Sequence, residues 1–149
     1  LDAHELTHSL LGDAVKPFWA DEGLAEYTAQ EVVQTRTICQ EDGFIDSNTG
    51  GGVQPYDNIS QFQWNYNSRS NYQTAVCAYR YIEQTYGKTA MRNIYSALIN
   101  SVTYAQRPGC QDTTNFYQNV LVRNTGPELL SVLTARFGIT SGEMTCQTP

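Results

Sequence analysis

The sequence predicts a mainly α-helical protein, and three observations support this prediction. Apolar residues recur every three or four positions between residues 72 and 86, which is the spacing of one face of an α-helix. Pro17 and Pro127 precede two expected helices, and Gly12, Gly87 and Gly138 follow three, as these residue types commonly do at helix ends. Residues 35–70 contain three successive glycines, Pro55 and many Asn and Asp residues, which favour turns. We therefore expect one helical domain over residues 1–149, with a long irregular loop at about residues 35–70.

Each expected helix has its own boundary signals. Pro17 begins the second helix, Gly87 ends the third, and Thr89 caps the fourth. Pro127 opens the last helix, and Gly138 closes it. The helices are expected at about residues 2–11, 18–33, 72–86, 89–99, 115–122 and 127–137.

The irregular loop carries three further features. Residues 61–66 alternate apolar and polar side chains, a pattern typical of a short strand. Asp42, Asp46 and Asn48 offer oxygen ligands of the kind that calcium prefers, but they match only part of a calcium-binding loop, so a solvated turn is the favoured interpretation. Asn58 begins an Asn-x-Ser acceptor sequence and is a candidate for N-glycosylation.

The composition argues against two classes of partner. The net charge is −6, and the chain contains no run of basic residues, which argues against nucleic acid. No apolar run approaches the length needed to cross a membrane.

The four cysteines are far apart and form no Cys-x-x-Cys pair, so a zinc-thiolate site is not expected. Their even number and the polar, lysine-poor composition favour an oxidising compartment, and hence an extracellular or secretory location with two disulfides. The alternative is that all four are buried free thiols. Of the possible pairings, the spacing favours Cys39–Cys77 together with Cys110–Cys146.

The most informative stretch is His4-Glu5-Leu6-Thr7-His8. On a helix, residues four positions apart share one face, so His4 and His8 can present two imidazoles to one metal ion. Glu5 lies at the edge of that face, where its carboxylate can take a proton from a water. The chain has no other histidine, and the alternative interpretation is a chance pair on a helix surface.

The second helix can supply a third ligand. The connection between the first two helices is short, so the second can fold back beside the first. Glu22 can then reach the metal, and Glu26, four residues later, can bind the free ring N–H of a ligating histidine. Two histidines and one carboxylate leave a coordination position open on zinc, as in catalytic sites. A structural zinc site is less expected, because no fourth His or Cys lies nearby.

These two blocks, His-Glu-x-x-His at residues 4–8 and Trp-Ala-Asp-Glu-Gly-Leu-Ala-Glu-Tyr at residues 19–27, resemble the gluzincin zinc metallopeptidases. The similarity is to the peptidase MA-like group, which is related to thermolysin and the aminopeptidases. The resemblance implies that Glu22 is the third zinc ligand, that Glu5 is the general base, and that Glu26 supports a ligating histidine. It also implies that the chain forms the helical part of a zincin-like fold.

The third helix extends the resemblance. Tyr72 begins a Tyr-Gln-Thr-Ala-Val segment similar to the helix that follows the metal-binding block in aminopeptidase-like members. There the leading tyrosine donates a hydrogen bond to the oxyanion, a role that Tyr72 would take here, while a core tyrosine is the alternative. In the family a β-sheet precedes the first helix. We therefore expect an upstream segment or partner chain to complete the domain, and one apolar face of the first and third helices to be exposed.

The residues and the resemblance together predict zinc-dependent hydrolysis of peptide bonds in peptide or protein substrates. Zinc would be held by His4, His8 and Glu22, and Glu5 would take a proton from the attacking water and pass it to the leaving amine. The alternative is a non-catalytic gluzincin-like binding or assembly module, which the polar, tyrosine-rich composition would also suit.

Overall fold

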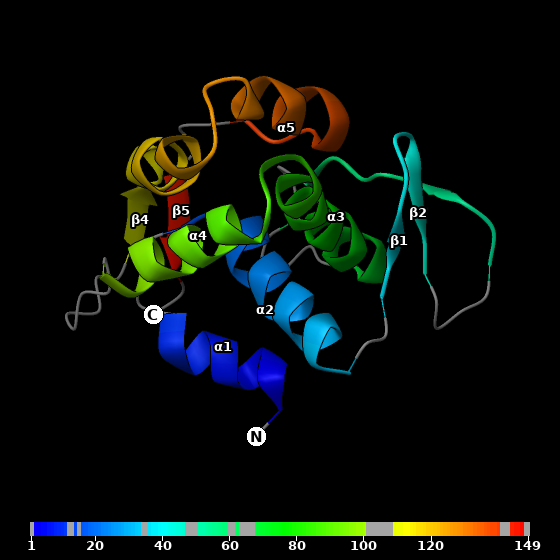
Figure 1. Ribbon diagram of the computed structural model, residues 1–149, viewed down its shortest axis with the longest axis horizontal. Coiled ribbons are helices and arrows are strands. Elements are labelled where there is room, and N and C mark those ends of the chain that lie inside the picture. Colours follow the sequence, from blue (N-terminus) through cyan, green and yellow to red (C-terminus); the bar gives the residue numbers. More distant parts are fainter. Residues whose placement is uncertain are drawn as a thin grey trace.

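The computed structural model confirms a mainly helical fold (Figure 1). It describes residues 2–11, 14, 16–33, 36–46, 51–59, 62, 68–100, 109–140 and 144–147. The helices are α1 (Ala3–Leu11), α2 (Phe18–Val33), α3 (Arg69–Tyr86), α4 (Lys88–Asn100), the π-helix η2 (Phe116–Leu121), the 3-10 helix η3 (Val122–Asn124) and α5 (Leu129–Phe137). The strands are β1 (Ile38–Cys39), β2 (Gly43–Ile45), β3 (Gln54–Pro55), β4 (Gly109–Asp112) and β5 (Met144–Gln147).

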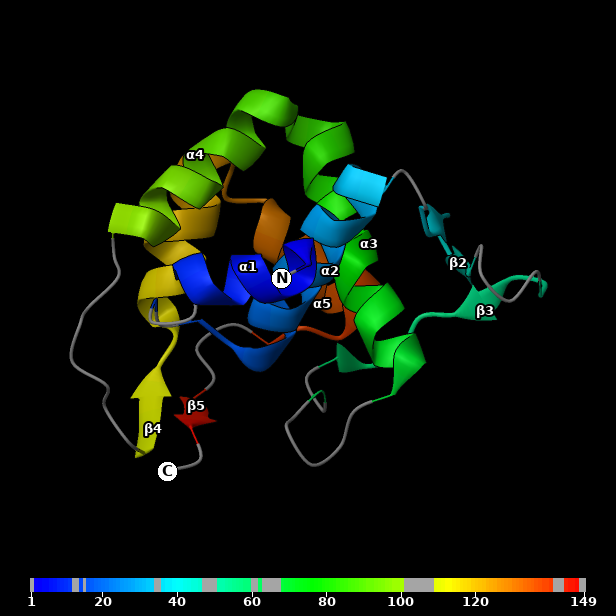
Figure 2. The same cartoon turned by 90° about the horizontal axis from the view of Figure 1, so that it is seen from below.

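Helix α2 runs through the middle of the molecule, with α1 on one side and α3 on the other (Figure 1). Helix α5 packs on α3, on the side away from α1. Two small antiparallel sheets lie at opposite ends of this helical body, β1–β2–β3 at one end and β4–β5 at the other (Figures 1 and 2). In the described part of the chain, no helix is long and apolar enough to span a membrane.

The helix boundaries follow from local capping. The side chain of Asp2 accepts a hydrogen bond from the N–H of Glu5 at 2.9 Å and so caps α1. Ser68 caps α3 in the same way, accepting from the N–H of Asn71 at 3.2 Å. Helix α5 ends at Gly138, whose φ of 67° is the left-handed conformation that glycine adopts without strain.

Helix α3 begins at Arg69 rather than at about residue 72, and α5 begins at Leu129, two residues after Pro127. Two other predicted helices also need correction. Helix α4 begins at Lys88, directly after Gly87, so Thr89 lies inside the first turn and is not the cap. The short helix predicted at residues 115–122 is largely a π-helix, continued by one turn of 3-10 helix. Both predicted helices exist, but their details depend on packing that local sequence signals do not specify.

Helices α2 and α3 approach each other closely at Gly23. A Cβ atom on Gly23 would lie only 2.8 Å from the Cβ of Ala75, so a larger residue would push the helices apart. On either side of this contact the core is fully buried, and it includes Trp19 and Tyr79. The hydroxyl of Tyr79 donates to the backbone oxygen of Ala20 at 2.8 Å, which satisfies the polar end of a buried ring. The close contact brings the first turns of α3 next to α2.

Exposed apolar residues were expected on one face of the first and third helices. On α1, Leu6 is 46% exposed and Leu10 is 62% exposed, and their spacing of four places them on one face. No residue of α3 is among the large hydrophobic residues that the described part of the chain exposes. The expectation is therefore met by α1 and is wrong for α3.

The loop predicted as irregular contains three strands of two or three residues. Ile38 pairs with Ile45, and Gly43 pairs with Pro55, so β2 lies between β1 and β3. Such short strands carry too few residues for an alternating pattern to be recognised. The short strand predicted at residues 61–66 falls, except for Phe62, outside the described residues.

The calcium and glycosylation candidates both lie in this loop. Both carboxylate oxygens of Asp46 are bound by the guanidinium of Arg69, so the structure does not leave this side chain free for calcium. Asp42 is exposed, and Asn48 lies outside the described residues. Asn58 is exposed and its side chain lies beside Gly138, and its glycosylation stays a prediction.

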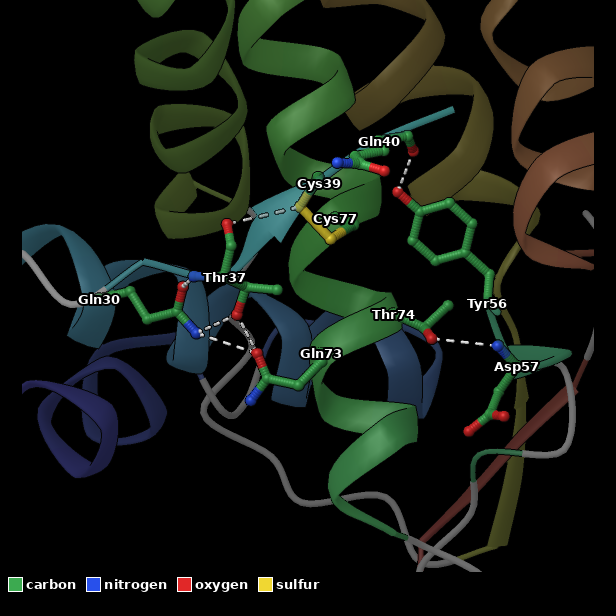
Figure 3. Close-up of a disulfide and its surroundings, with 9 residues drawn as sticks. All are labelled: Gln30, Thr37, Cys39, Gln40, Tyr56, Asp57, Gln73, Thr74 and Cys77. Carbon is green, nitrogen blue, oxygen red and sulfur yellow. Dashed lines mark hydrogen bonds between the residues drawn. A yellow bond between two sulfur atoms is a disulfide. The ribbon is translucent and has the colours of Figure 1, made fainter. Parts of the chain in front are cut away.

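The disulfide predicted between Cys39 and Cys77 is confirmed, with the two Cα atoms 5.6 Å apart (Figure 3). It ties β1 to the middle of α3. Beside it, the N–H of Thr37 donates to Gln30 Oε1 at 2.9 Å, and the Thr37 hydroxyl donates to Gln73 (Figure 3). The disulfide and this buried hydrogen-bond network together hold the chain after α2 against α3.

The pairing of β4 with β5 is compatible with the second predicted disulfide. Strands β4 and β5 pair in a register that places Cys110 directly opposite Cys146. Opposed residues in an antiparallel pair have Cα atoms about 4.5–5.5 Å apart, within the range that a disulfide spans. The Cys110–Cys146 bond stays a prediction.

Removing the first disulfide should destabilise the fold. The bond joins residues separated by 38 positions. Closing a loop of that length reduces the entropy of the unfolded chain, which raises the free energy of the unfolded state by about 4 kcal/mol. We expect the double variant Cys39→Ala/Cys77→Ala to lose about that much free energy of unfolding, measured by urea denaturation. A loss below about 1 kcal/mol would show that this bond does not constrain the unfolded chain as described.

Candidate metal centre

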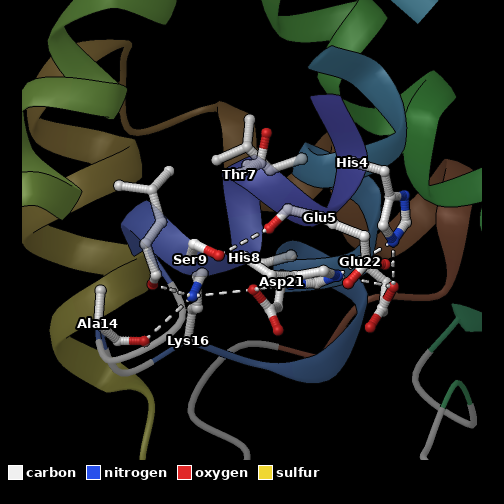
Figure 4. Close-up of polar contacts among 12 residues, drawn as sticks. His4, Glu5, Thr7, His8, Ser9, Ala14, Lys16, Asp21 and Glu22 are labelled. Carbon is white, nitrogen blue, oxygen red and sulfur yellow. Dashed lines mark hydrogen bonds and ion pairs between the residues drawn. The ribbon is translucent and has the colours of Figure 1, made fainter. Parts of the chain in front are cut away.

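Three predicted ligands come together where α1 and α2 face each other. His4 and His8 lie one turn apart on α1, and Glu22 lies in the first part of α2 (Figure 4). The Nε2 atoms of the two histidines are 3.1 Å apart. Glu22 Oε2 is 3.3 Å from each of these nitrogen atoms. The three atoms thus form a nearly equilateral triangle.

The size and chemistry of this triangle fit a zinc ion. Nitrogen and oxygen ligands lie about 2.0–2.1 Å from zinc, and two ligands of a tetrahedral ion at that distance are about 3.3 Å apart. The observed separations of 3.1 and 3.3 Å match that value. Two imidazoles and one carboxylate are also the donor set of catalytic zinc sites with an open fourth position. His4, His8 and Glu22 therefore can hold a metal ion together.

Each histidine is oriented by a carboxylate on its other ring nitrogen. Glu26 Oε1 lies 2.7 Å from His4 Nδ1, as predicted from the sequence. Asp21 Oδ1 lies 3.3 Å from His8 Nδ1 and is not among the residues predicted from the sequence. A carboxylate at Nδ1 favours the tautomer that carries its proton there, which leaves Nε2 free to bind a metal.

Asp21 and the adjoining Lys16 are the site residues that sequence reasoning missed. The ammonium of Lys16 lies 3.0 Å from Asp21 Oδ1, and its side chain is only 2% exposed. The signal for Asp21 was its position directly before the predicted ligand Glu22, inside the conspicuous block at residues 19–27. Its role depends on how α1 and α2 are rotated against each other, which the spacing does not specify.

Glu5 lies on the same helix as the two histidines, at an exposed position next to His4. Its backbone is fixed by two hydrogen bonds: its N–H donates to Asp2, and its carbonyl accepts from the hydroxyl of Ser9 at 3.1 Å. Among the described residues, no hydrogen bond or ion pair of the Glu5 carboxylate is found. Its side chain is therefore available at the edge of the metal-binding face.

Tyr72 lies in the first turn of α3 and is half-buried. Its ring packs edge-on against Phe62, with centroids 4.9 Å apart. Burial first, and then the charges of Glu22 and Glu26 and a hydrogen bond with Glu22, raise the pKa of the Tyr72 phenol. The phenol is therefore neutral near pH 7 and can donate a hydrogen bond. Tyr72 is thus a packed residue that also reaches the candidate metal centre.

A pocket of about 380 Å³ opens beside His4 and Tyr72. Its wall is formed by polar side chains of α1, α2 and the start of α3: His4, Glu26, Ser68, Arg69, Tyr72 and Gln73. Arg69 is held in place by its contacts with Asp46, and Gln73 by the network beside the disulfide. The pocket adjoins the ligand His4 and is open to solvent, so it can admit part of a substrate.

A comparison of the chain with protein-family models gave no match, and neither did comparisons with curated proteins and with solved structures. The resemblance to gluzincins therefore rests on the motif residues at 4–8, 19–27 and 72–76.

The protonation of His8 makes metal binding pH-dependent. Hydrogen bonds to Asp21 and Glu22 raise the pKa of His8 from 6.5 to about 10 in the metal-free chain. Because the folded pKa lies above the unfolded one, this stabilisation is fully present below about pH 6.5 and is lost as the pH rises through about 10. A metal ion must displace the proton on His8 Nε2 before it can bind that nitrogen.

We expect zinc uptake at pH 7 to release about one proton from His8. We also expect the apparent zinc affinity to rise about tenfold for each pH unit above pH 7. Titration calorimetry in buffers with different ionisation enthalpies measures the number of protons released. Asp21→Asn, which removes a negative charge from His8, should release fewer protons at the same pH. Binding heats that do not depend on the buffer would contradict the assignment of His8 as a protonated ligand.

Proposed function

We propose that the chain is a zinc-dependent peptidase of the gluzincin type. The observation that supports this most strongly is the triangle formed by His4, His8 and Glu22, whose edges have the length that tetrahedral zinc requires. The carboxylates on the outer nitrogens of both histidines support the same conclusion, because such partners are regular features of zinc sites.

In this proposal each residue has a defined task. His4, His8 and Glu22 hold the ion, while Glu26 and Asp21 orient the two imidazoles. Zinc at this position supplies an activated water and polarises the substrate carbonyl. The exposed carboxylate of Glu5 accepts a proton from the attacking water and then donates it to the leaving amine.

Tyr72 and the pocket complete the proposed active site. The phenol of Tyr72 donates a hydrogen bond to the carbonyl oxygen as negative charge develops on it. The pocket beside His4 and Tyr72 holds a residue of the peptide next to the scissile bond, which positions that bond over the ligands.

The substrate is a peptide or protein, most simply one outside the cytosol. The Cys39–Cys77 disulfide fits an oxidising compartment, and the net charge of −6 without a basic run gives no surface for nucleic acid. We propose an extracellular or secretory location on these grounds.

Incubation of the purified chain with one equivalent of zinc and a mixture of peptides tests the proposed function. We expect new peptide termini by mass spectrometry, loss of cleavage with a zinc chelator, and recovery when zinc is returned. A folded chain that binds zinc and cleaves no peptide, alone or with a partner that completes the domain, would contradict the proposal and favour a non-catalytic binding or assembly module.

Tyr72→Phe should separate cleavage from metal binding. The phenylalanine keeps the packing against Phe62 but cannot stabilise the developing charge, and loss of one such donor typically lowers kcat by about 100-fold or more. Zinc affinity should stay within about twofold of the wild type. Tyr86→Phe, at the exposed end of the same helix, is the matched control and should leave kcat unchanged. Unchanged kcat in Tyr72→Phe would make Tyr72 a core residue only.

A further inference from the structure

Lys16 is a buried cation that the proposed mechanism does not use. It lies between α1 and α2, and its ammonium makes three contacts: 2.6 Å to Leu11 O, 3.2 Å to Ala14 O and 3.0 Å to Asp21 Oδ1 (Figure 4). An ammonium has three N–H donors, so these acceptors satisfy it completely. Removing such a charge from water is costly unless the protein provides this kind of full replacement. The surroundings of Lys16 are therefore built around a positive charge.

Two of the contacts of Lys16 fix the end of the helix that carries both histidines. Leu11 is the last residue of α1, and Ala14 follows in the connection to α2. Carbonyl groups at a helix C-terminus have no partner within the helix and carry partial negative charge, so a cation there is favourable. Lys16 thus anchors the C-terminal end of α1 near the start of α2.

The third contact reaches the metal centre through one atom. Asp21 Oδ1 lies 3.0 Å from the Lys16 ammonium and 3.3 Å from His8 Nδ1, so the same oxygen joins the cation to the imidazole. In the part of the chain that the structure describes, His4 has no equivalent arrangement. Its partner Glu26 makes no ion pair with a lysine or arginine among the described residues.

We propose that Lys16 is a positioning residue of the metal centre, which holds Asp21 against His8 and so keeps His8 Nε2 directed toward His4 and Glu22 before metal binds. This inference rests on the proposed function, because it takes the three residues to be metal ligands. If Lys16 only stabilised the connection between α1 and α2 through Leu11 and Ala14, the effect of its replacement on zinc affinity would be the same with and without Asp21.

Zinc affinity in a double-mutant cycle distinguishes these two roles. The purified full chain and the variants Lys16→Met, Asp21→Asn and the double variant are titrated with zinc against a chromophoric chelator. Affinities are compared after correction for the proton that His8 releases on binding, which their pH dependence gives. Partners of a ligating histidine typically contribute 10–100-fold to metal affinity, so we expect losses in that range in the corrected affinity of both single variants. Because Lys16 acts through Asp21, the double variant should bind zinc no more than about twofold more weakly than the weaker single variant.

Lys88→Met is the matched control, since Lys88 is the other lysine of the chain and is exposed at the start of α4. It should bind zinc as the wild type does. Cobalt in place of zinc gives a further readout, because its visible absorption should shift in Lys16→Met and not in Lys88→Met if the ligand geometry has changed.

Two results would overturn the inference while leaving the proposed function intact. One is zinc affinity in Lys16→Met within about twofold of the wild type, and the other is losses that multiply in the double variant. If circular dichroism shows that Lys16→Met does not fold, Asp21→Asn alone decides: wild-type affinity overturns the inference, because Lys16 reaches His8 only through Asp21. A folded wild-type chain that binds no zinc would overturn both this inference and the proposed function.

Discussion

Replacing Glu5 by glutamine is expected to lower peptide cleavage by about 100- to 10,000-fold, the usual contribution of a positioned general acid or base. Glutamine has nearly the same shape as glutamate but cannot accept the proton of the attacking water. The Glu5 carboxylate makes no hydrogen bond or ion pair with another described residue, and the backbone bonds to Asp2 and Ser9 do not depend on the side chain. The fold and the zinc content should therefore be unchanged.

This expectation is checked by measuring kcat, zinc content and the melting temperature for the same preparation. Glu41→Gln, at an exposed position in the loop between β1 and β2, removes the same charge outside the candidate metal centre and should behave as the wild type. If zinc-loaded Glu5→Gln keeps cleavage within tenfold of the wild type, Glu5 is not the base.

Replacing Glu22 by glutamine should have the largest effect on metal binding. Glu22 Oε2 lies 3.3 Å from the Nε2 atoms of both His4 and His8, so it forms two of the three edges of the ligand triangle. A neutral amide oxygen is a weaker ligand for zinc than a carboxylate. We expect zinc affinity to fall by more than about 100-fold, beyond the range of residues that only support a ligand.

Glu26→Gln provides the comparison, because Glu26 binds the outer nitrogen of His4 and is not one of the three proposed ligands. Its loss of zinc affinity should lie within about 10–100-fold and below that of Glu22→Gln. Chelator competition measures both variants under the same conditions. Full retention of zinc by Glu22→Gln would remove Glu22 from the ligand set.

The helices of the site follow closely from local sequence signals. The predicted ranges 2–11 and 18–33 agree with α1 and α2 to within one residue, because an aspartate cap and a proline mark where these helices begin. The ligands follow from helical spacing, since His4 and His8 must share a face once α1 forms. Glu22 lies close to both histidines because the connection between α1 and α2 is short, so α2 packs beside α1.

The remaining features of the fold and the site depend on contacts between elements that are not predicted by local sequence signals. Asp21 reaches His8 only because of the way α2 is rotated against α1. Glycine is needed at position 23 because Ala75 of α3 packs directly against it. Lys16 looks like an ordinary loop residue until its three acceptors are seen together. The pairing of β4 with β5 joins segments more than 30 residues apart, which the sequence connects only through the expected Cys110–Cys146 disulfide and not through a strand pattern.

X-ray absorption spectroscopy of the zinc-loaded wild-type chain is the decisive measurement for the proposed ligands His4, His8 and Glu22, because it reports the atoms bound to the metal. We expect one zinc per chain, with nitrogen and oxygen neighbours at about 2.0–2.1 Å and the multiple scattering expected of two imidazoles. Sulfur neighbours at about 2.3 Å, a spectrum without imidazole scattering, or a folded chain that retains no zinc would contradict this expectation.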